Sequence, residues 1–268
     1  MNSLEAPARA AGHSYDATYY ATHCGQSYTR TPVWLEFFGG IADRIIEHVH
    51  PKTVLDAGCA IGLLVEALRA RGVDAFGLDI SEYAISQTTP ESRPFCRMGS
   101  LTDKLDRRYD LIVCIEVVEH LSPADGALVL DNLCAHTDDI LFSSTPLDRD
   151  EPTHLNVQEP EIWAEFFAQR GFVRDVDFDA SVINAWALRL RRSNAESPEL
   201  VRNYERLLWE KKREALALAR GLEASEARRV AEADQLGVEI KHQRQVIDTL
   251  LSSRALRLAA WLRGLVGR

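Results

Sequence analysis

Val54-Leu55-Asp56-Ala57-Gly58-Cys59-Ala60-Ile61-Gly62 is an apolar strand that runs into a glycine turn, and the turn opens a helix. The two glycines let the backbone approach a ligand closely, because they carry no Cβ atom. The turn follows the carboxyl end of the strand, where open α/β sheets bind their ligands. This stretch therefore predicts a fold class and the position of a binding site together.

Strand-like and helix-like segments alternate on both sides of this turn. A helix is expected from Pro32 to His48, with Thr31 as its N-cap. Apolar strands follow at DAFGLDI, FCRMG, YDLIVCIE and ILFSST, and helices are expected between them. This alternation is typical of a parallel sheet covered on both faces. FVRDVDF and INAWALRLRR follow one another without a helix and predict an antiparallel pair, so we expect an α/β fold with a mostly parallel, seven-stranded sheet.

Composition limits the partners and the compartment. The chain has 268 residues, with 31 Lys+Arg against 40 Asp+Glu, so its overall charge does not attract nucleic acid. Its five cysteines are scattered and lack the paired spacing of zinc or redox motifs, which predicts a reducing compartment. No apolar stretch is long enough to span a bilayer. We therefore expect a cytoplasmic protein.

Four segments follow from these patterns. Residues 1–31 form an N-terminal arm or lid, and residues 32–192 form the α/β domain. A polar linker then leads into a helical or coiled-coil extension at 193–250 and a basic amphipathic tail at 251–268.

Asp79 ends the second strand, seventeen residues after Gly62. A carboxylate at this place can accept hydrogen bonds from both hydroxyls of a ribose. A dinucleotide-binding turn would read G-x-G-x-x-G, and this turn does not. The pattern favours a nucleoside without a pyrophosphate.

The motifs VLDAGCAIG, GLDIS and YDLIVCIEVVEHL, in this order and spacing, resemble the class I S-adenosylmethionine-dependent methyltransferases over about residues 33–190. The resemblance implies a Rossmann-like fold with S-adenosylmethionine as cofactor. It places the methionine part beside Asp56, Gly58, Cys59 and Gly62, the ribose on Asp79, and the adenine against Ile80. The family often has an acidic residue where this chain reads Gly99-Ser100-Leu101, so the adenine contact falls to the Ser100 hydroxyl or to the backbone.

Candidate acceptor-side groups follow the YDLIVCI strand and the ILFSST strand: Glu116, Glu119, His120 and His154. Carboxylates and imidazoles suit a divalent cation that lowers the pKa of an acceptor hydroxyl. The set is similar to the E-x-x-E-H plus distant His arrangement of small-RNA 2′-O-methyltransferases and some ubiquinone-pathway O-methyltransferases, which implies Mg²⁺ or a similar ion on these four residues. The E-H pair also occurs in metal-free relatives. In that alternative His120 or His154 is the general base, with Glu119 beside it.

The N-terminal arm is rich in aromatic residues, which are Tyr15, Tyr19, Tyr20, His23 and Tyr28. In one interpretation the tyrosines roof the acceptor pocket and Arg30 pairs with the cofactor carboxylate. In the other, the aromatic residues only dock the arm on the core.

The extension and the tail point to partners. Leu236, Ile240, Gln243, Ile247 and Leu250 keep the four-three spacing of a coiled coil, although the phase does not carry back to Leu218, Leu222 and Ser225. This pattern predicts a homo-oligomer. Four arginines and no acidic residue follow Thr249, namely Arg254, Arg257, Arg263 and Arg268, beside an apolar face of Leu251, Ala255, Leu258, Leu262 and Leu265. The tail predicts peripheral contact with the inner face of the membrane, or packing on a partner subunit or on the body of the protein.

The expected function is methyl transfer from S-adenosylmethionine to an oxygen. The tail is similar to a short motif of bacterial polysaccharide glycosyltransferases, which implies a sugar hydroxyl in a glycan or a related metabolite as the acceptor. One alternative is an O-methyltransferase of quinone or polyketide-type small molecules, and nitrogen or carbon acceptors stay open. Another is a non-catalytic scaffold that oligomerises through its helix.

Overall fold

The computed structural model describes residues 15–24, 27–252 and 254–266. The chain divides into two compact units, one that ends at Ser197 and one that begins at Pro198. The first unit holds the sheet and its covering helices, and the second is helical.

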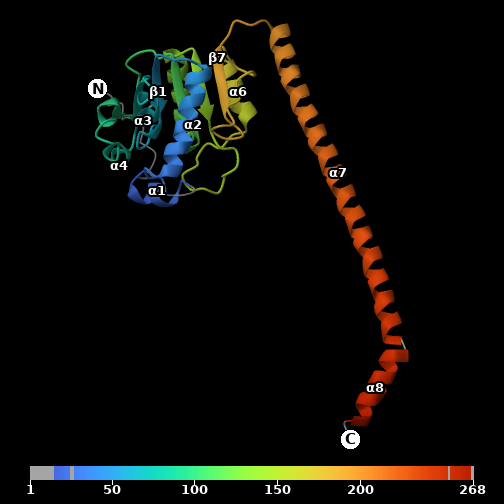
Figure 1. The fold of residues 1–268 in the computed structure, drawn as a ribbon. Helices are drawn as coiled ribbons and strands as arrows, with labels where there is room; N and C mark the ends of the chain where they lie inside the picture. Colours follow the sequence, from blue (N-terminus) through green and yellow to red (C-terminus); the bar gives the residue numbers. More distant parts are fainter. Residues whose placement is uncertain (1–14, 25–26, 253, 267–268) are drawn as a thin grey trace, which may run out of the picture. The chain divides into compact units, whose positions relative to one another are not determined.

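A seven-stranded sheet forms the centre of the first unit (Figure 1). Its strands are β1 (Thr53–Ala57), β2 (Asp74–Asp79), β3 (Cys96–Met98), β4 (Leu111–Ile115), β5 (Asp139–Ser143), β6 (Phe172–Arg174) and β7 (Leu188–Arg192). Their order is β3-β2-β1-β4-β5-β7-β6. The first five strands are parallel, and β7 runs antiparallel to both β5 and β6. The predicted mostly parallel sheet with a terminal antiparallel pair is confirmed.

Two helices precede the first strand, and the others lie between strands. They are α1 (Ala17–Thr22), α2 (Pro32–His48), α3 (Leu63–Arg69), α4 (Glu82–Ser86), α5 (Pro123–His136) and α6 (Pro160–Ala168), with short 3-10 turns at η1 (Arg93–Phe95) and η2 (Val118–His120). The α2 helix has the predicted bounds because the Thr31 side chain accepts a hydrogen bond from the Trp34 N–H at its first turn. Proline fits the next position. The N–H of the first helical residue has no acceptor within the helix, so the lack of an N–H in proline costs no hydrogen bond there.

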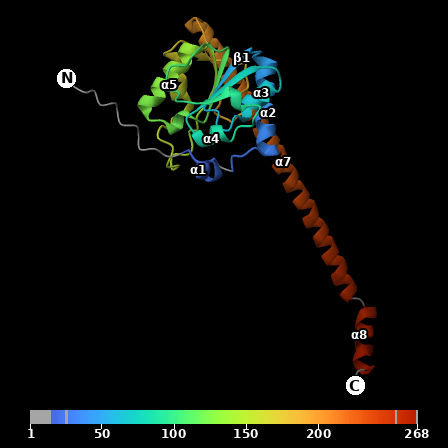
Figure 2. The ribbon, with the colours of Figure 1, turned by 90° about the vertical axis from the view of Figure 1, so that its left-hand side faces the viewer.

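The sheet separates two apolar cores, because successive side chains of a strand point to opposite faces. Along β1, Val54 packs with α2 and α3, whereas Leu55 packs with α5 and α6. The same alternation occurs at Leu111 and Ile112 of β4. Figure 2 shows α2 and α3 on one side of the sheet and α5 on the other. The central strands β1, β4 and β5 are buried on both faces, as their near-continuous apolar sequences predict.

The carboxyl ends of the parallel strands meet at one edge of the sheet. The chain leaves β1 toward β2 and β3, and then crosses back to β4 on the other side of β1. The strand order reverses there, and α/β sheets bind ligands in the crevice at such a point. The short helix α1 lies at one end of the sheet in both views (Figures 1 and 2).

The second unit holds α7 (Ser197–Ser252), apart from its first residue, and α8 (Arg254–Val266). The predicted helical extension is confirmed. In α8, Leu258, Trp261 and Leu262 are exposed. The side chains of Leu251, Arg254, Ala255 and Leu265, and all of Arg268, lie outside the described residues, so the amphipathic face of the tail stays a prediction. Among the helices of the described segments, none is long and apolar enough to cross a membrane.

Candidate active site

The glycine turn after β1 forms the floor of the candidate site. Gly58 has φ +89°, and a Cβ atom there would lie 2.3 Å from a methyl carbon of Val117. The N–H of Gly58 donates to the carbonyl of Leu78 over 2.8 Å, which ties the turn to the end of β2. Gly62 has φ +75° and is the N-cap of α3. Only glycine combines this close approach with a left-handed backbone at no steric cost.

Asp79 closes the end of β2 beside this turn. Asp79 is 8% exposed. It accepts hydrogen bonds from the N–H groups of Ala60 and Ser81, both over 2.8 Å. Burial raises the pKa of this carboxyl, and the backbone N–H groups partly offset the rise. Each oxygen keeps a lone pair for a further donor, because a carboxylate accepts about four hydrogen bonds.

Asp56 is a buried acid at the centre of the sheet edge. Among the described residues, none donates a hydrogen bond to its side chain. Burial raises the pKa of the Asp56 carboxyl to about 8, and the charge of Asp79 adds to the rise. This environment therefore holds Asp56 neutral at pH 7, and a cation placed beside it would favour its ionised form.

This pKa predicts how stability depends on pH. The folded protein keeps the Asp56 proton up to about pH 8, whereas the unfolded chain releases it near pH 3.8. Stability is therefore lost as pH rises through this window, by up to about 1.4 kcal/mol per pH unit. We expect Asp56→Asn to remove this loss, so that its melting temperature without ligand exceeds that of the wild type more at pH 8 than at pH 5. Thermal unfolding at both pH values measures the effect, and parallel pH profiles would contradict it.

A cavity of about 560 Å³ joins these groups to the opposite rim. Six of the sequence-predicted cofactor residues line it, namely Asp56, Gly58, Cys59, Asp79, Ile80 and Ser100. Gly62 lies behind the turn, at the start of α3. The Ser100 hydroxyl lies 2.7 Å from that of Thr102, where loop residues 99–102 form one wall.

Arg30 does not line the cavity, which corrects the prediction that it faces a cofactor carboxylate. Its guanidinium makes two hydrogen bonds to the Glu66 carboxylate of α3, over 2.6 and 3.1 Å. This ion pair lies on the surface, and the Arg30 side chain is half exposed. The planar guanidinium matches the two oxygens of Glu66, so local geometry pairs Arg30 with α3.

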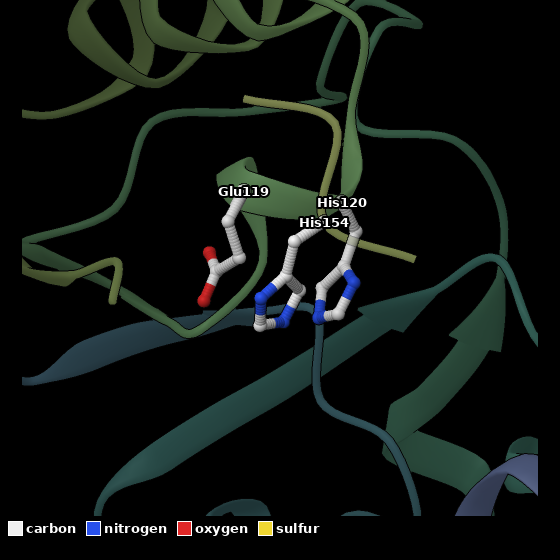
Figure 3. A group of neighbouring side chains, drawn as sticks. All are labelled: Glu119, His120 and His154. Atoms are coloured by element: carbon white, nitrogen blue, oxygen red, sulfur yellow. The ribbon is translucent and has the colours of Figure 1, made fainter. Parts of the chain in front are cut away.

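Three predicted acceptor-side residues meet at the opposite rim (Figure 3). One ligand atom each of Glu119, His120 and His154 lies within 4.8 Å of the others. The two imidazole rings have centroids 4.7 Å apart. In Figure 3 the three side chains point in the same direction.

Backbone carbonyls orient both imidazoles. The Nδ1 of His120 lies 3.2 Å from the carbonyl of Thr153, and the Nδ1 of His154 lies 2.7 Å from that of Asp148. Since a carbonyl only accepts, each Nδ1 carries the proton and each Nε2 has a free lone pair when its ring is neutral. Burial lowers the pKa of His120 to about 4, and His154 adds to the effect. His120 is therefore an unprotonated base at neutral pH.

Glu116 does not join this group, which corrects its assignment as a fourth ligand. It has φ +52°, because the chain makes a sharp turn between β4 and η2 instead of a regular helix. Its Oε1 accepts hydrogen bonds from the Ser143 hydroxyl, the Asn184 amide and the Trp186 indole, over 2.7 to 3.1 Å. Burial raises the pKa of Glu119, and the neighbouring Glu116 raises it further.

The described part of the N-terminal arm, from Tyr15 on, lies at this rim. The Tyr19 hydroxyl lies 3.3 Å from His120 Nε2. Burial raises the pKa of this hydroxyl, so it stays protonated and donates to the free lone pair. The Tyr15 ring packs edge-on against Tyr19, with centroids 4.9 Å apart. Both rings line the cavity, so the arm contributes a wall as well as a docking surface.

A family model of methyltransferase domains matches residues 35–175, more than half of the chain. The chain belongs to this family. The ubiquinone biosynthesis O-methyltransferase of Nitrosomonas europaea is 33% identical over 102 residues, which cover 35% of this chain and 42% of that protein. The enzyme of the same name from Methylococcus capsulatus is 30% identical over 106 residues, 35% of this chain and 43% of that protein. The chain therefore spans about two fifths of the length of these curated relatives.

Among solved structures, the magnesium protoporphyrin IX methyltransferase of Synechocystis PCC 6803 is 19% identical, with a TM-score of 0.48. The alignment covers 59% of this chain and 79% of that one.

Two wall residues of this methyltransferase domain escape the sequence analysis. Asn184 and Trp186 lie in INAWALRLRR, which alone reads as one strand, but β7 begins only at Leu188. Residues 183, 184 and 186 instead line the cavity. The one available signal is the amide of Asn184 in an apolar run. This signal does not show that the Asn184 amide bonds to Glu116, which is 68 residues away.

Proposed function

We propose that this protein is an S-adenosylmethionine-dependent O-methyltransferase that acts on a small molecule with an aromatic hydroxyl. One observation carries the proposal: a phenolic hydroxyl, that of Tyr19, already lies at the unprotonated Nε2 of His120 inside the cavity. The same nitrogen suits an acceptor hydroxyl. Family membership and the glycine turn support the cofactor part.

The residues at the β1 end fit the cofactor. Asp79 has lone pairs left for ribose hydroxyls, and the buried Asp56 carboxyl suits the positive charges of the methionine part. Gly58 has no Cβ atom, so the turn packs against Val117 and still lines the cavity with its backbone. When bound, S-adenosylmethionine supplies a methyl group on a sulfonium. The chain's own residues hold the acceptor in line and take its proton, which are the two tasks that such a displacement requires.

The walls favour an aromatic acceptor over a sugar. Ring side chains line the cavity, and they are Tyr15, Tyr28, Trp34, Phe37, Phe38 and Trp186. A sugar ring would bring several hydroxyls, each of which costs free energy if it is buried without a partner. The curated relatives are named for ubiquinone biosynthesis, which also favours the small-molecule alternative. The glycan acceptor predicted from the tail has no such support in this domain.

The Glu119, His120 and His154 group also fits a divalent cation. Each Nε2 carries a lone pair, that of His120 taken by the Tyr19 hydroxyl, and carbonyls fix both rings as outer-sphere partners of metal ligands do. Such an ion would lower the pKa of an acceptor hydroxyl. His120 is already neutral and within reach of a hydroxyl, however, so base catalysis needs no ion. We propose the metal-free form.

A chelator separates these two forms. We expect the rate of methyl transfer to change less than about twofold after treatment with EDTA and gel filtration. A large loss that Mg²⁺ restores would overturn the metal-free form and assign the ion to these three residues. The stability of the untreated and treated protein, followed by thermal unfolding, serves as the control.

The function itself is tested in two steps. Calorimetry with S-adenosylhomocysteine comes first, and absence of binding would favour the scaffold alternative. Mass spectrometry then follows methyl transfer to catechol, to a simple phenol and to a methyl glycoside. We expect an O-methyl product from the aromatic acceptors. Product from the glycoside alone would overturn the acceptor class and leave the enzyme class in place.

A further inference from the structure

The helix α7 carries an apolar residue line that its own unit does not cover. Every seventh residue from Val201 onward belongs to this line, which is Val201, Leu208, Ala215, Leu222, Arg229, Leu236, Gln243 and Leu250. Six of these eight positions are apolar. The line follows one side of the helix for roughly 75 Å, since each residue adds about 1.5 Å. A repeat of exactly seven residues is the period of a left-handed coiled coil.

A second apolar row accompanies this line and changes sides once. In the first half the extra residues lie three positions after the line, at Tyr204 and Leu218, and the polar Lys211 and Ser225 interrupt this row. In the second half they lie four positions after it, at Ile240 and Ile247. The seam thus shifts between Leu222 and Leu236 and continues. Because of this shift, a single heptad phase fits only the second half of α7.

These side chains are exposed to water within the described second unit. Leu222 is 66% exposed, Leu236 is 63% exposed and Ile240 is 55% exposed. Exposing such a regular apolar seam to water costs about 25 cal/mol for each Å² of apolar surface. Most helices of proteins draw their stability from burying one apolar face. A second surface of matching period would supply this burial.

We propose that α7 pairs with α7 of a second copy of this chain in a parallel, in-register coiled coil. The second half of the seam sets the number of strands. Isoleucine at 240 and 247 alternates with leucine at 236 and 250, and this arrangement favours two parallel strands. Gln243 then faces the partner's Gln243, and a paired polar residue fixes the register.

Charge sets the orientation. Glu239 and Arg244 flank the seam, five residues apart, which is the spacing at which flanking residues of parallel strands meet. Glu239 therefore faces the partner's Arg244, and the pair occurs twice by symmetry. In an antiparallel pair, the edge of the seam that carries Glu232 and Glu239 would face the same edge of the partner helix. The acidic side chains would then repel one another. Within its own helix the Glu239 carboxylate accepts a hydrogen bond from the Gln243 amide, over 3.0 Å.

Sedimentation equilibrium of the full chain tests the assembly. We expect the mass of two chains at micromolar concentration. Leu236→Asp should weaken the dimer at least tenfold, because it buries a charge in the seam. Val238→Asp is the matched control, since Val238 is 68% exposed and lies on the opposite side of the helix. It should leave the dimer intact. The mass of one chain for the wild type, or equal loss in both variants, overturns the proposal, and a mass of three or more chains overturns the two-stranded form.

Disulfide formation tests the register. Gln243→Cys should give a covalent dimer under mild oxidation, because only a parallel, in-register pair brings the two positions together. Val238→Cys serves as the control for chance oxidation and for the native cysteines. Reversal of one charge, Glu239→Arg, should weaken the dimer, and Glu239→Arg with Arg244→Glu should restore it. No covalent dimer from Gln243→Cys, together with no rescue by the double reversal, would overturn the parallel arrangement.

Discussion

Asp79→Ala is expected to weaken binding of S-adenosylhomocysteine at least about a hundredfold. Two hydrogen bonds from ribose hydroxyls to a carboxylate are worth about 1.5 kcal/mol each or more, and about 3 kcal/mol corresponds to this factor. The substitution also removes the acceptor for the Ala60 and Ser81 N–H groups. The glycine turn then keeps only its backbone bonds to Leu78 at the end of β2, so the change acts on the ligand contact and on the shape of the site.

Two variants separate these effects. Asp79→Asn keeps the size of the side chain and one oxygen acceptor, so we expect an intermediate affinity. Asp74 begins the same strand at its other end and pairs with Arg69 on the surface. Asp74→Ala should therefore keep the wild-type affinity. Calorimetry on all three variants, with the melting temperature of each, gives the comparison. Wild-type affinity in Asp79→Ala would show that the cofactor does not bind at the end of β2.

The contrast between Asp79 and Glu116 shows what the sequence determines. The strand, the glycine turn and the start of α3 are contiguous in sequence, and their φ angles follow from local chemistry. The parallel sheet then brings the ends of β1 and β2 together, because neighbouring parallel strands end at the same edge. The predicted position of Asp79 beside the turn therefore needs only the order of the strands.

Glu116 depends on contacts that no local pattern encodes. Its indole partner, Trp186, lies 70 residues away in the loop before β7, and the exact start of that strand decides where the indole points. Arg30 fails as a prediction for a similar reason, since Glu66 of α3 comes within reach only after α2 and α3 pack together. The Tyr19 contact with His120 spans 101 residues. Sequence indicated an aromatic arm near the site, but the atom that the arm contacts follows from the folded structure.

His120→Ala is expected to lower kcat of the proposed O-methyl transfer by about a hundredfold to ten-thousandfold, the usual contribution of a positioned base. The Nε2 atom carries this role, because the Thr153 carbonyl occupies the other ring nitrogen. Affinity for S-adenosylhomocysteine should change less than about twofold, since the proposed cofactor residues Asp56 and Asp79 lie at the other rim of the cavity. His48→Ala is the matched control, because His48 lies at the far end of α2 and bonds only to Arg44 among the hydrogen bonds of the described residues.

The pH profile checks the same assignment. The pKa of His120 is about 4, so its base form persists as pH falls from 8 to 5, and kcat should not decline in this range through His120. Protonation would begin to lower kcat only close to pH 4. A base with the ordinary pKa of about 6.5 would instead halve the rate near that pH. A decline centred near pH 6.5 that His120→Ala abolishes would contradict the buried, neutral imidazole.

Tyr19→Phe completes the test, since it removes only the hydroxyl at His120 Nε2. An acceptor hydroxyl has to replace that of Tyr19 to reach the base, so the variant should lower KM for the aromatic acceptor while kcat stays within about threefold. The Tyr15 and Tyr20 rings still pack against the phenylalanine. A fall of kcat as large as that of His120→Ala would instead make the Tyr19 hydroxyl part of the catalytic group. Steady-state kinetics of the two variants therefore determine whether the acceptor displaces the Tyr19 hydroxyl from His120 or the Tyr19 hydroxyl takes part in catalysis.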